Sequence, residues 1–331
     1  MFIGNQKLNS VGVDMSDHVI RIVGVQQQGK KKRVTHFGQQ LLPDGMMVNG
    51  IIHNQDAVIK TITNLLSTTH IRRHRTIAVV SLPEYHGFIK TIHLQDEPIE
   101  KEIQKHLPFP ETEVTIDTVR DDHTLSFAAV KTDIAMSYAE SVEAAGLHVG
   151  ALEIESQAIA RLFIPREKIP ETIVLADIGR NHTTILVVTH GRIDFTHTSK
   201  FISGKMLTEA IAKTLNVSEA EAEKMKMTKQ EDTRIHAVIQ EHTTLLSNEL
   251  KRVIHFHQEH TAEQEAPQYV VYLIGGGSKI DHIRQYLEEY IHYPVQQAKM
   301  AEPIVIPDTL QSELLSYGTA IGLAIRTTTL F

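Results

Sequence analysis

The chain has 331 residues, 41% of them hydrophobic and 22% charged, which is typical of a folded protein with more than one lobe. The absence of cysteine excludes disulfides, thiolate catalysis and cysteine-based zinc sites. A formal net charge of −7 argues against nucleic acid as a partner.

No segment has the pattern of a targeting or membrane-spanning sequence. The first residues lack a basic stretch followed by an apolar one, and no apolar run reaches about 18 residues. The ending GLAIRTTTLF continues a helix and is not a basic amphipathic membrane-targeting tail. We therefore expect a soluble, cytoplasmic protein.

The first predicted element is a three-stranded meander over residues 11–37. An apolar strand ends at Asp14, a short polar turn leads into a second apolar strand, and a turn at Gly29 leads into a third. The basic run GKKKR, residues 29–33, could touch acidic lipid, but we interpret it as an exposed hairpin turn. Next follow a helix with Val58, Ile62, Leu65 and Leu66 on one face and the strand TIAVVSLP.

Residues 83–149 are predicted to form an insertion in the first lobe. The pattern indicates the strand GFIKTIHL, a helix that carries Ile99, Ile103 and Leu107, the strands VTIDTV and TLSFAAV, and a helix over 133–146.

A second meander begins at residue 174 with VLADIGRNHTTILVV. Its first strand ends at Asp177, turns at Gly179 and continues through a turn at Gly191 into a third strand. Asp-x-Gly is also ordinary turn chemistry. The matched aspartates, Asp14 and Asp177, nevertheless favour a duplicated α/β fold with two carboxylates that face one cleft and hold a metal-bound phosphate.

A glycine-rich turn follows a later strand in QYVVYLIGGGSKIDHIRQYLEEYI. Three glycines, 275–277, let the backbone approach a phosphate without Cβ clashes. The turn fits neither the Walker A nor the G-x-G-x-x-G pattern. The helix after it is predicted to present Ile280, Ile283, Tyr286 and Leu287 on one face.

Two further helices are predicted, and the histidine clusters are not predicted to bind metal. A long helix presents Ile235, Val238, Leu245, Leu246, Leu250 and Val253, and a C-terminal helix begins at about residue 311. His70 and His74 lie among arginines that would repel a cation, and HFHQEH (255–260) is not a zinc-binding H-E-x-x-H motif. We interpret both clusters as solvated surface.

The order of these motifs resembles the superfamily of actin, the sugar kinases and the DnaK-type chaperones. Within it, nearly the whole chain is similar to the family of the type IV pilus assembly protein PilM, a relative of FtsA. The segments that carry this resemblance are residues 41–66, 99–118, 138–163, 205–226 and 314–326. The resemblance implies a two-lobed actin-like fold, a duplicated ribonuclease-H-like α/β fold, with an inserted subdomain of the FtsA and PilM type.

The resemblance also implies four parts and a nucleotide site. The expected parts are 8–82 with 150–170 and 311–331 (first lobe), 83–149 (inserted subdomain), 171–200 with 265–310 (second lobe) and 201–264 (helical subdomain). The expected contacts of ATP or ADP are Asp14, Ser16, Asp17, His18, Arg21, Asp177, Gly179, Arg180, Asn181, His182, Thr183, Glu223, Lys226, Gly275, Gly276, Gly277 and Ser278. Asp14 and Asp177 would hold Mg²⁺ through water.

Some of these positions depart from the family pattern or allow two interpretations. Ser16 stands where the family has glycine, Asp17 adds a negative charge beside the expected phosphates, and Arg21 replaces a lysine. Glu155 either positions water or complements the dipole of the helix that follows it. Glu223 and Lys226 contact adenosine in the resemblance, whereas charges on such a helix are also typical of a solvated face.

The resemblance implies a cytoplasmic, nucleotide-binding scaffold for type IV pilus assembly or a related secretion or competence system, recruited to the inner face of the cytoplasmic membrane. Its partner would be the N-terminal cytoplasmic peptide of a PilN-like inner-membrane protein, docked between the first lobe and the 83–149 insertion. Self-association is a further expectation, and contact with the membrane would occur only through partners. The alternatives are a small-molecule kinase or active ATPase on the same fold, and an FtsA-like filament former. Nucleotide hydrolysis would be slow at most.

Overall fold

The structure, a computed structural model, describes residues 9–29, 31–94, 97–121, 123–165, 171–228, 232–260, 267–280 and 282–326. It divides into a first unit, Met1–Pro165 with Met300–Phe331, and a second unit, Arg166–Lys299. The finer division into four parts stays a prediction.

The first unit is built on a six-stranded sheet with the order β10-β6-β1-β2-β3-β16. β1 pairs with β2 antiparallel and with β6 parallel, and β2 pairs with β3 antiparallel, so the predicted meander is present. Long apolar runs in β2 and β6 are buried, as expected for strands covered on both faces. The strands are β1 (Asn9–Met15), β2 (Val19–Gln28), β3 (Lys31–Leu41), β6 (Thr76–Leu82), β10 (His148–Ile154) and β16 (Ile304–Val305).

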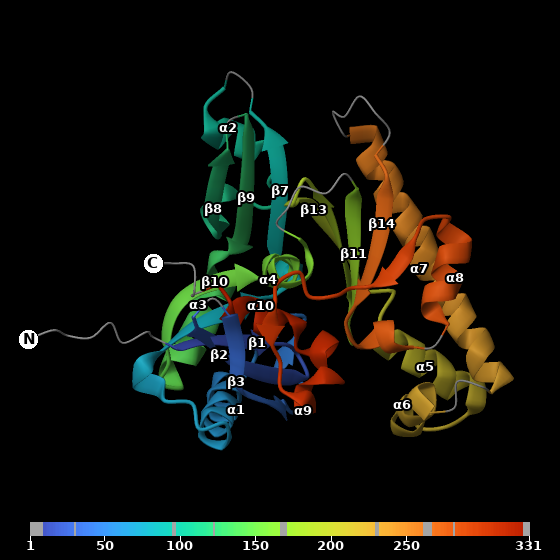
Figure 1. The fold of residues 1–331 in the computed structure, drawn as a ribbon, viewed down its shortest axis with the longest axis horizontal. Coiled ribbons are helices and arrows are strands. Elements are labelled where there is room, and N and C mark those ends of the chain that lie inside the picture. The colour runs from blue at the N-terminus through green and yellow to red at the C-terminus, as the bar shows by residue number, and fades with distance from the viewer. Residues whose placement is uncertain are drawn as a thin grey trace, which may run out of the picture. The chain divides into compact units, whose positions relative to one another are not determined.

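Two pairs of helices pack on this sheet. α4 (Glu155–Phe163) and α10 (Gly318–Ala324) pack against each other, and α10 also contacts β1, as Figure 1 shows. This approach needs glycine: a Cβ on Gly12 would lie 2.0 Å from the carbonyl oxygen of Ala320, and one on Gly322 would lie 2.0 Å from that of Ala158. The second pair is α1 (Gln55–Thr68) and α3 (Thr132–Ala144). The predicted face of α1, with Val58, Ile62, Leu65 and Leu66, is buried.

Smaller elements complete the first unit. The predicted insertion contains the antiparallel strands β7, β9 and β8, whose Leu125 and Phe127 form a small core with Ile92 and Ile103. A short hairpin, β4 with β5, follows β3. The bounds are β4 (Met47–Val48), β5 (Ile51–Ile52), β7 (Gly87–His93), α2 (Ile99–Gln104), β8 (Val114–Asp121), β9 (Thr124–Lys131) and α9 (Asp308–Gln311).

The second unit repeats the strand arrangement of the first. Its order, β15-β14-β11-β12-β13, matches β10-β6-β1-β2-β3, with the same parallel and antiparallel pairings. The duplication predicted from the two Asp-ended meanders is therefore present in the topology. The strands are β11 (Thr172–Ile178), β12 (Thr183–Thr189), β13 (Arg192–Ser199), β14 (Tyr269–Ile274) and β15 (Val295–Gln297).

Four helices of the second unit share one hydrophobic core with this sheet. α7 contacts α5, β12 and α8, and Figure 1 shows α7 and α8 side by side. The bounds are α5 (Gly204–Leu215), α6 (Glu219–Thr228), α7 (Thr233–His260) and α8 (Ile283–Ile291).

Several predicted helix ends were wrong. Ile280 is extended and His282 is left-handed (φ 65°), so α8 begins only at Ile283. α2 ends at Gln104, and Leu107, which precedes a proline, packs on its core from a loop. The C-terminal helix begins at Gly318 rather than at about 311, because Glu313 and Tyr317 have turn conformations that interrupt it.

Three predicted exposures were also wrong. Leu245 lies beside the buried stripe of α7 and is 48% exposed. His257 is buried instead of solvated, because its ring hydrogen-bonds with Tyr269 and Asp194 in the core of the second unit. Lys32 of the basic run lies within β3, where its ammonium group is paired with Glu302 at 2.9 Å.

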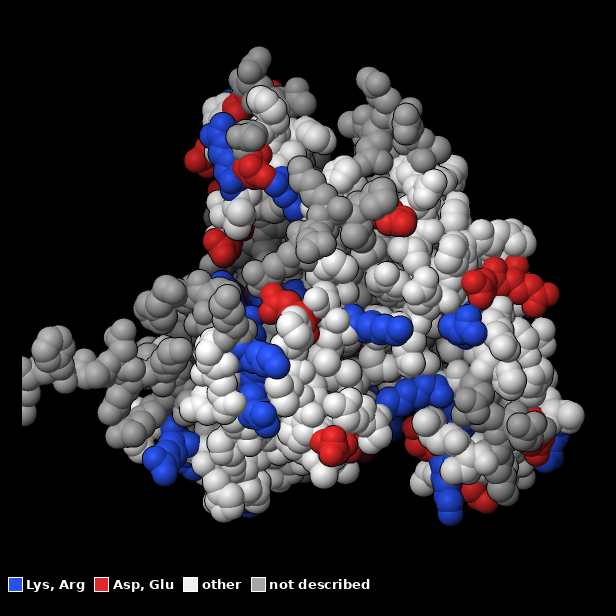
Figure 2. Space-filling view, viewed as in Figure 1, with Lys and Arg blue, Asp and Glu red and all other residues white. Residues whose placement is uncertain are grey.

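Among the residues described, no helix is both long and apolar enough to cross a bilayer. On the face drawn in Figure 2, basic and acidic side chains of the described residues are interspersed among uncharged ones.

Candidate functional site

The turn between β1 and β2 contains the first group of predicted site residues. Asp14 is 6% exposed and pairs in register with Arg21, whose guanidinium group lies 3.7 Å from the carboxylate. The amide and the hydroxyl of Ser16 both donate to the carbonyl of Val19. Ser16 therefore closes the turn with its own side chain at the position where the family pattern has glycine.

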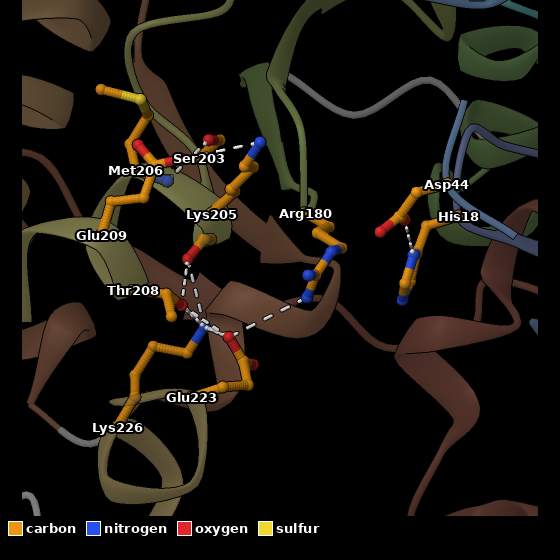
Figure 3. Close-up of polar contacts among 11 residues, drawn as sticks. His18, Asp44, Arg180, Ser203, Lys205, Met206, Thr208, Glu209, Glu223 and Lys226 are labelled. Atoms are coloured by element: carbon orange, nitrogen blue, oxygen red, sulfur yellow. Dashed lines mark hydrogen bonds and ion pairs between the residues drawn. The ribbon is translucent and has the colours of Figure 1, made fainter. Parts of the chain in front are cut away.

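The next two residues of this turn contact the chain that follows β3. The carboxylate of Asp17 accepts hydrogen bonds from the amides of Asn49 and Gly50, each at 2.8 Å. Nδ1 of His18 lies 3.7 Å from the carboxylate of Asp44, and Figure 3 shows the two side chains facing each other. The extra negative charge of Asp17 is thus partly offset by two backbone dipoles.

Two acidic residues, Glu155 and Glu84, are associated with the first turn of α4. Glu155 is its first residue and is partly exposed, so both interpretations of its role stay open. Glu84 is 4% exposed and accepts hydrogen bonds from the amide and the hydroxyl of Ser156. Glu84 was not predicted from the sequence. The signal that could have found it is its position in the chain. Glu84 follows β6, and the glycine turn follows β14, which is the equivalent strand of the second unit.

Two tyrosines lie among these acidic groups. Burial, followed by the charges of Asp17 and Glu155, raises the pKa of Tyr85 to about 12. Burial, followed by the charges of Glu155, Asp17 and Asp14, raises the pKa of Tyr138 well above its ordinary value. The charges of Asp17 and Glu155 therefore affect both tyrosines, and that of Asp14 affects Tyr138 as well.

In the second unit, Asp177 lies directly beside the glycine turn. Asp177 pairs in register with Ile274, the last residue of β14. A Cβ on Gly275 would lie 2.3 Å from Oδ1 of Asp177, and the φ of Gly275 is +79°. The conformation and the crowding both require glycine at this position.

The other two glycines differ in what their surroundings require. A Cβ on Gly277 would lie 2.2 Å from the side chain of Ile178, so this glycine is needed for packing. A Cβ on Gly276 would meet no protein atom of the described residues within 4 Å, and this residue is exposed. Ser278 is buried, and its hydroxyl donates to the carbonyl of Gly275. Gly276 is therefore the position at which the turn is open to a ligand.

The turn between β11 and β12 is joined to the first turn of α5. The amide of Gly179 donates to the carbonyl of His182 at 3.0 Å. The carbonyls of Gly179 and Arg180 accept hydrogen bonds from the amides of Gly204 and Lys205, at 2.9 and 2.8 Å. The two loops are consequently held in one arrangement. Asn181 is partly exposed in this turn, and Thr183 is fully buried at the start of β12.

Lys226 is buried and forms a polar cluster with the partly exposed Glu223, so that these two charges are not simply a solvated face. Lys226 is 5% exposed, and its ammonium group donates to Glu223, Thr208 and the carbonyl of Gly204, at 2.8, 3.0 and 3.2 Å. Arg180 lies 4.0 Å from Glu223 (Figure 3). Burial raises the pKa of Glu223, but hydrogen bonds from Lys226 and Thr208 and nearby positive charge outweigh it, and the pKa is lowered.

His242 of α7 is a second residue that our sequence analysis missed. It is 9% exposed, and its Nε2 atom has no hydrogen-bond partner among the described residues. Burial, followed by the charge of Lys226, lowers its pKa to about 4. A neutral imidazole thus lies beside the cluster, and no motif in the sequence marks it.

The predicted residues form two groups, one in each unit. Asp14, Ser16, Asp17, His18 and Arg21 belong to the first unit, and the turn, cluster and glycine residues belong to the second. Within the described residues, no group of three or more histidine, aspartate or glutamate side chains is arranged to hold a metal ion. Joint binding of Mg²⁺ by Asp14 and Asp177 through water stays a prediction.

Comparison with known proteins agrees with this architecture. A family model described as "Type IV pilus assembly protein PilM" matches residues 12–328. A chain of the PilM–PilN type IV pilus biogenesis complex is 23% identical and has a TM-score of 0.81, with 96% of this chain and 98% of that chain covered.

Two further solved structures share the fold. The ethanolamine utilization protein EutJ from Carboxydothermus hydrogenoformans has a TM-score of 0.62 and 18% identity, over 96% of this chain and 89% of that one. MreB5 of Spiroplasma citri bound to ADP has a TM-score of 0.58 and 13% identity, over 97% of both chains. The chain therefore has the actin-like ATPase fold.

Proposed function

Because the chain belongs to the type IV pilus assembly protein PilM family, we propose that it is an actin-like, nucleotide-binding scaffold for type IV pilus assembly. It would bind a pilus protein of the inner membrane at the cytoplasmic face, and bound nucleotide would change its affinity for that protein. The family match over residues 12–328 carries the pilus role.

The glycine turn beside Asp177 carries the nucleotide part of the proposal. Gly275 and Gly277 are required by the protein's own packing, whereas the space at Gly276 is open. A glycine turn after a strand, beside a carboxylate at the end of the neighbouring strand, suits a phosphate with its hydrated Mg²⁺. The ADP bound to MreB5, which has the same fold, supports this reading.

The residues present fit ATP or ADP with Mg²⁺. Asp14 and Asp177 would orient water on the metal, and the turns at Ser16–His18 and Gly179–His182 would bind phosphate oxygens, whereas the predicted Thr183 is fully buried. Glu223 and Lys226 would contact adenosine through a cluster that is already ordered by internal hydrogen bonds. When bound, Mg²⁺ supplies charge neutralisation for the phosphates.

The proposed partner is the N-terminal cytoplasmic tail of a PilN-like protein, docked between the first lobe and the 83–149 insertion. The similarity to a chain of the PilM–PilN complex supports this partner. An extended tail would gain affinity from backbone hydrogen bonds and from pockets for its side chains.

The test is binding of a synthetic tail peptide, with a scrambled peptide as control. Met136→Glu on α3 of the insertion is compared with Leu245→Glu on α7, because these residues are 53% and 48% exposed. We expect weaker binding for Met136→Glu only. Equal binding by both variants would reject the insertion as the docking region, and no binding of the tail to the wild type would reject the partner.

A further inference from the structure

The tip of the β4–β5 hairpin is held by the turn between β1 and β2, which is the first of the two turns proposed to bind phosphate. Its two turn residues, Asn49 and Gly50, both have positive φ angles of 51° and 76°, the pattern of a two-residue hairpin turn. Their amides donate to the two carboxylate oxygens of Asp17, each at 2.8 Å. Asp17 therefore joins the predicted phosphate turn to a hairpin more than thirty residues later.

The same tip is held from its other side. Tyr138 of α3 donates its hydroxyl to the carbonyl of Gly50 at 3.0 Å, and His86 contacts the carbonyl of Asn49 through Nε2 at 2.9 Å. A Cβ on Gly50 would lie 2.5 Å from the ring of Pro83, so the tip packs tightly there. We call Asp17, His86 and Tyr138 the tip clamp. Its members come from three separate elements.

The tip clamp lies in a region of negative charge. Together with burial, the charges of Glu155, Asp17 and Asp14 all raise the pKa of the Tyr138 hydroxyl. Arg21 lies beside Asp14. A phosphate that enters the turn is repelled by these carboxylates. In this structure the carboxylate of Asp17 is directed onto the hairpin, and the amides of Asn49 and Gly50 stabilise its negative charge there.

We propose that the hairpin tip sets the affinity of the first turn for nucleotide phosphate through Asp17. With the tip docked, its amides hold the carboxylate on the hairpin and the turn accepts phosphate. With the tip undocked, the carboxylate is released and opposes phosphate binding. This inference rests on the proposed nucleotide-binding function.

Coupling of this kind acts in both directions. If the docked tip favours nucleotide, then bound nucleotide stabilises the docked tip by the same factor. Tyr138 belongs to α3, within the 83–149 segment proposed to receive the partner. A partner that shifts α3 would thereby alter nucleotide affinity without contact with the nucleotide.

The test is a double-mutant cycle on the affinity for Mg-ATP. Tyr138→Phe removes only the hydroxyl that holds the tip, and Asp17→Asn removes only the charge. We expect Tyr138→Phe to weaken binding about fivefold or more, the lower range of typical couplings. Asp17→Asn should tighten binding, and Tyr138→Phe should change it less than about twofold in the Asp17→Asn background.

A matched control and a second readout complete the test. Tyr290→Phe, which removes a hydroxyl near Gln240 in the second unit, should leave the affinity unchanged. Mg-ATP should slow hydrogen exchange at the amides of Asn49 and Gly50 in the wild type. If Tyr138→Phe does not fold, His86→Ala takes its place in the cycle.

The outcomes separate this inference from the proposed function. Suppose that nucleotide binding is measurable and that Tyr138→Phe changes the affinity equally in the wild-type and Asp17→Asn backgrounds, or changes it in neither. Either result would overturn the coupling alone. Binding by none of the four proteins of the cycle would overturn both. Binding by Asp17→Asn but not by the wild type would show that the Asp17 charge opposes phosphate even with the tip docked, and would overturn the coupling alone.

Discussion

Replacement of Gly275 by alanine should destabilise the second unit strongly, although it adds one methyl group. Gly275 has φ +79° and ψ 176°, a region that is almost restricted to glycine and costs about 1–3 kcal/mol for other residues. The new Cβ would lie 2.3 Å from Asp177 and 2.6 Å from the carbonyl of Ile178. Relief of this overpacking costs about 1–3 kcal/mol more.

The expected loss is therefore about 2–6 kcal/mol of unfolding free energy, or about 1–3 M in the urea midpoint at a slope of about 2 kcal/mol per M. Urea unfolding followed by circular dichroism measures it. Gly276→Ala is the matched control, because its Cβ meets no described protein atom within 4 Å, and it should change the free energy by less than about 0.5 kcal/mol. Equal midpoints for the two variants would refute the assignment of different roles to adjacent glycines.

Three further predictions concern ionisable side chains that are buried or partly buried. Because the pKa of His242 is lowered to about 4 in the folded protein, His242 takes up a proton on unfolding below pH 6.5. The wild type should therefore lose about 2 kcal/mol of unfolding free energy between pH 7 and pH 5, and the His242→Gln variant should not show this loss. Urea midpoints that change equally with pH in the two proteins would contradict this. The pKa of Glu223 is lowered in the folded protein, so the wild type should exceed Glu223→Gln in unfolding free energy. This difference should be full above pH 4.5 and should disappear as the pH falls through the lowered pKa. A difference that persists in acid would count against this role of Glu223. Arg161→Met leaves the 3% exposed Glu153 without its paired guanidinium group and should cost about 3 kcal/mol in thermal unfolding, whereas a loss below about 1 kcal/mol would show that Arg326 suffices.

Periodicity and internal similarity predicted most of the fold. The Asp14 and Asp177 meanders share strand order and pairing, because a strand, a tight turn and a second apolar strand leave a clear local pattern. The ends of helices were predicted less well. The left-handed conformation of His282 and the turn conformation of Tyr317, which decide where α8 and α10 begin, have no signal in the hydrophobic periodicity.

The candidate site was predicted where it lies in turns and was missed where it depends on contacts distant in sequence. The glycine turn is recognisable by composition, but only the structure distinguishes Gly276 from its neighbours. The hydrogen bonds of Asp17 to Asn49 and Gly50 have no sequence signal, because a carboxylate in a turn is equally typical of a solvated residue. The burial of Lys226 follows from the packing of α5 on α6.

The measurement that tests the central claim most directly is retention of labelled Mg-ATP by the purified chain, with its conversion to ADP followed over time. The wild type should retain nucleotide and turn it over slowly or not at all, and Asp177→Ala and Gly276→Asp should lose it. Rapid turnover would indicate an active ATPase instead of a scaffold. Absence of retained nucleotide in the wild type, or full retention by Gly276→Asp, would contradict the proposed site.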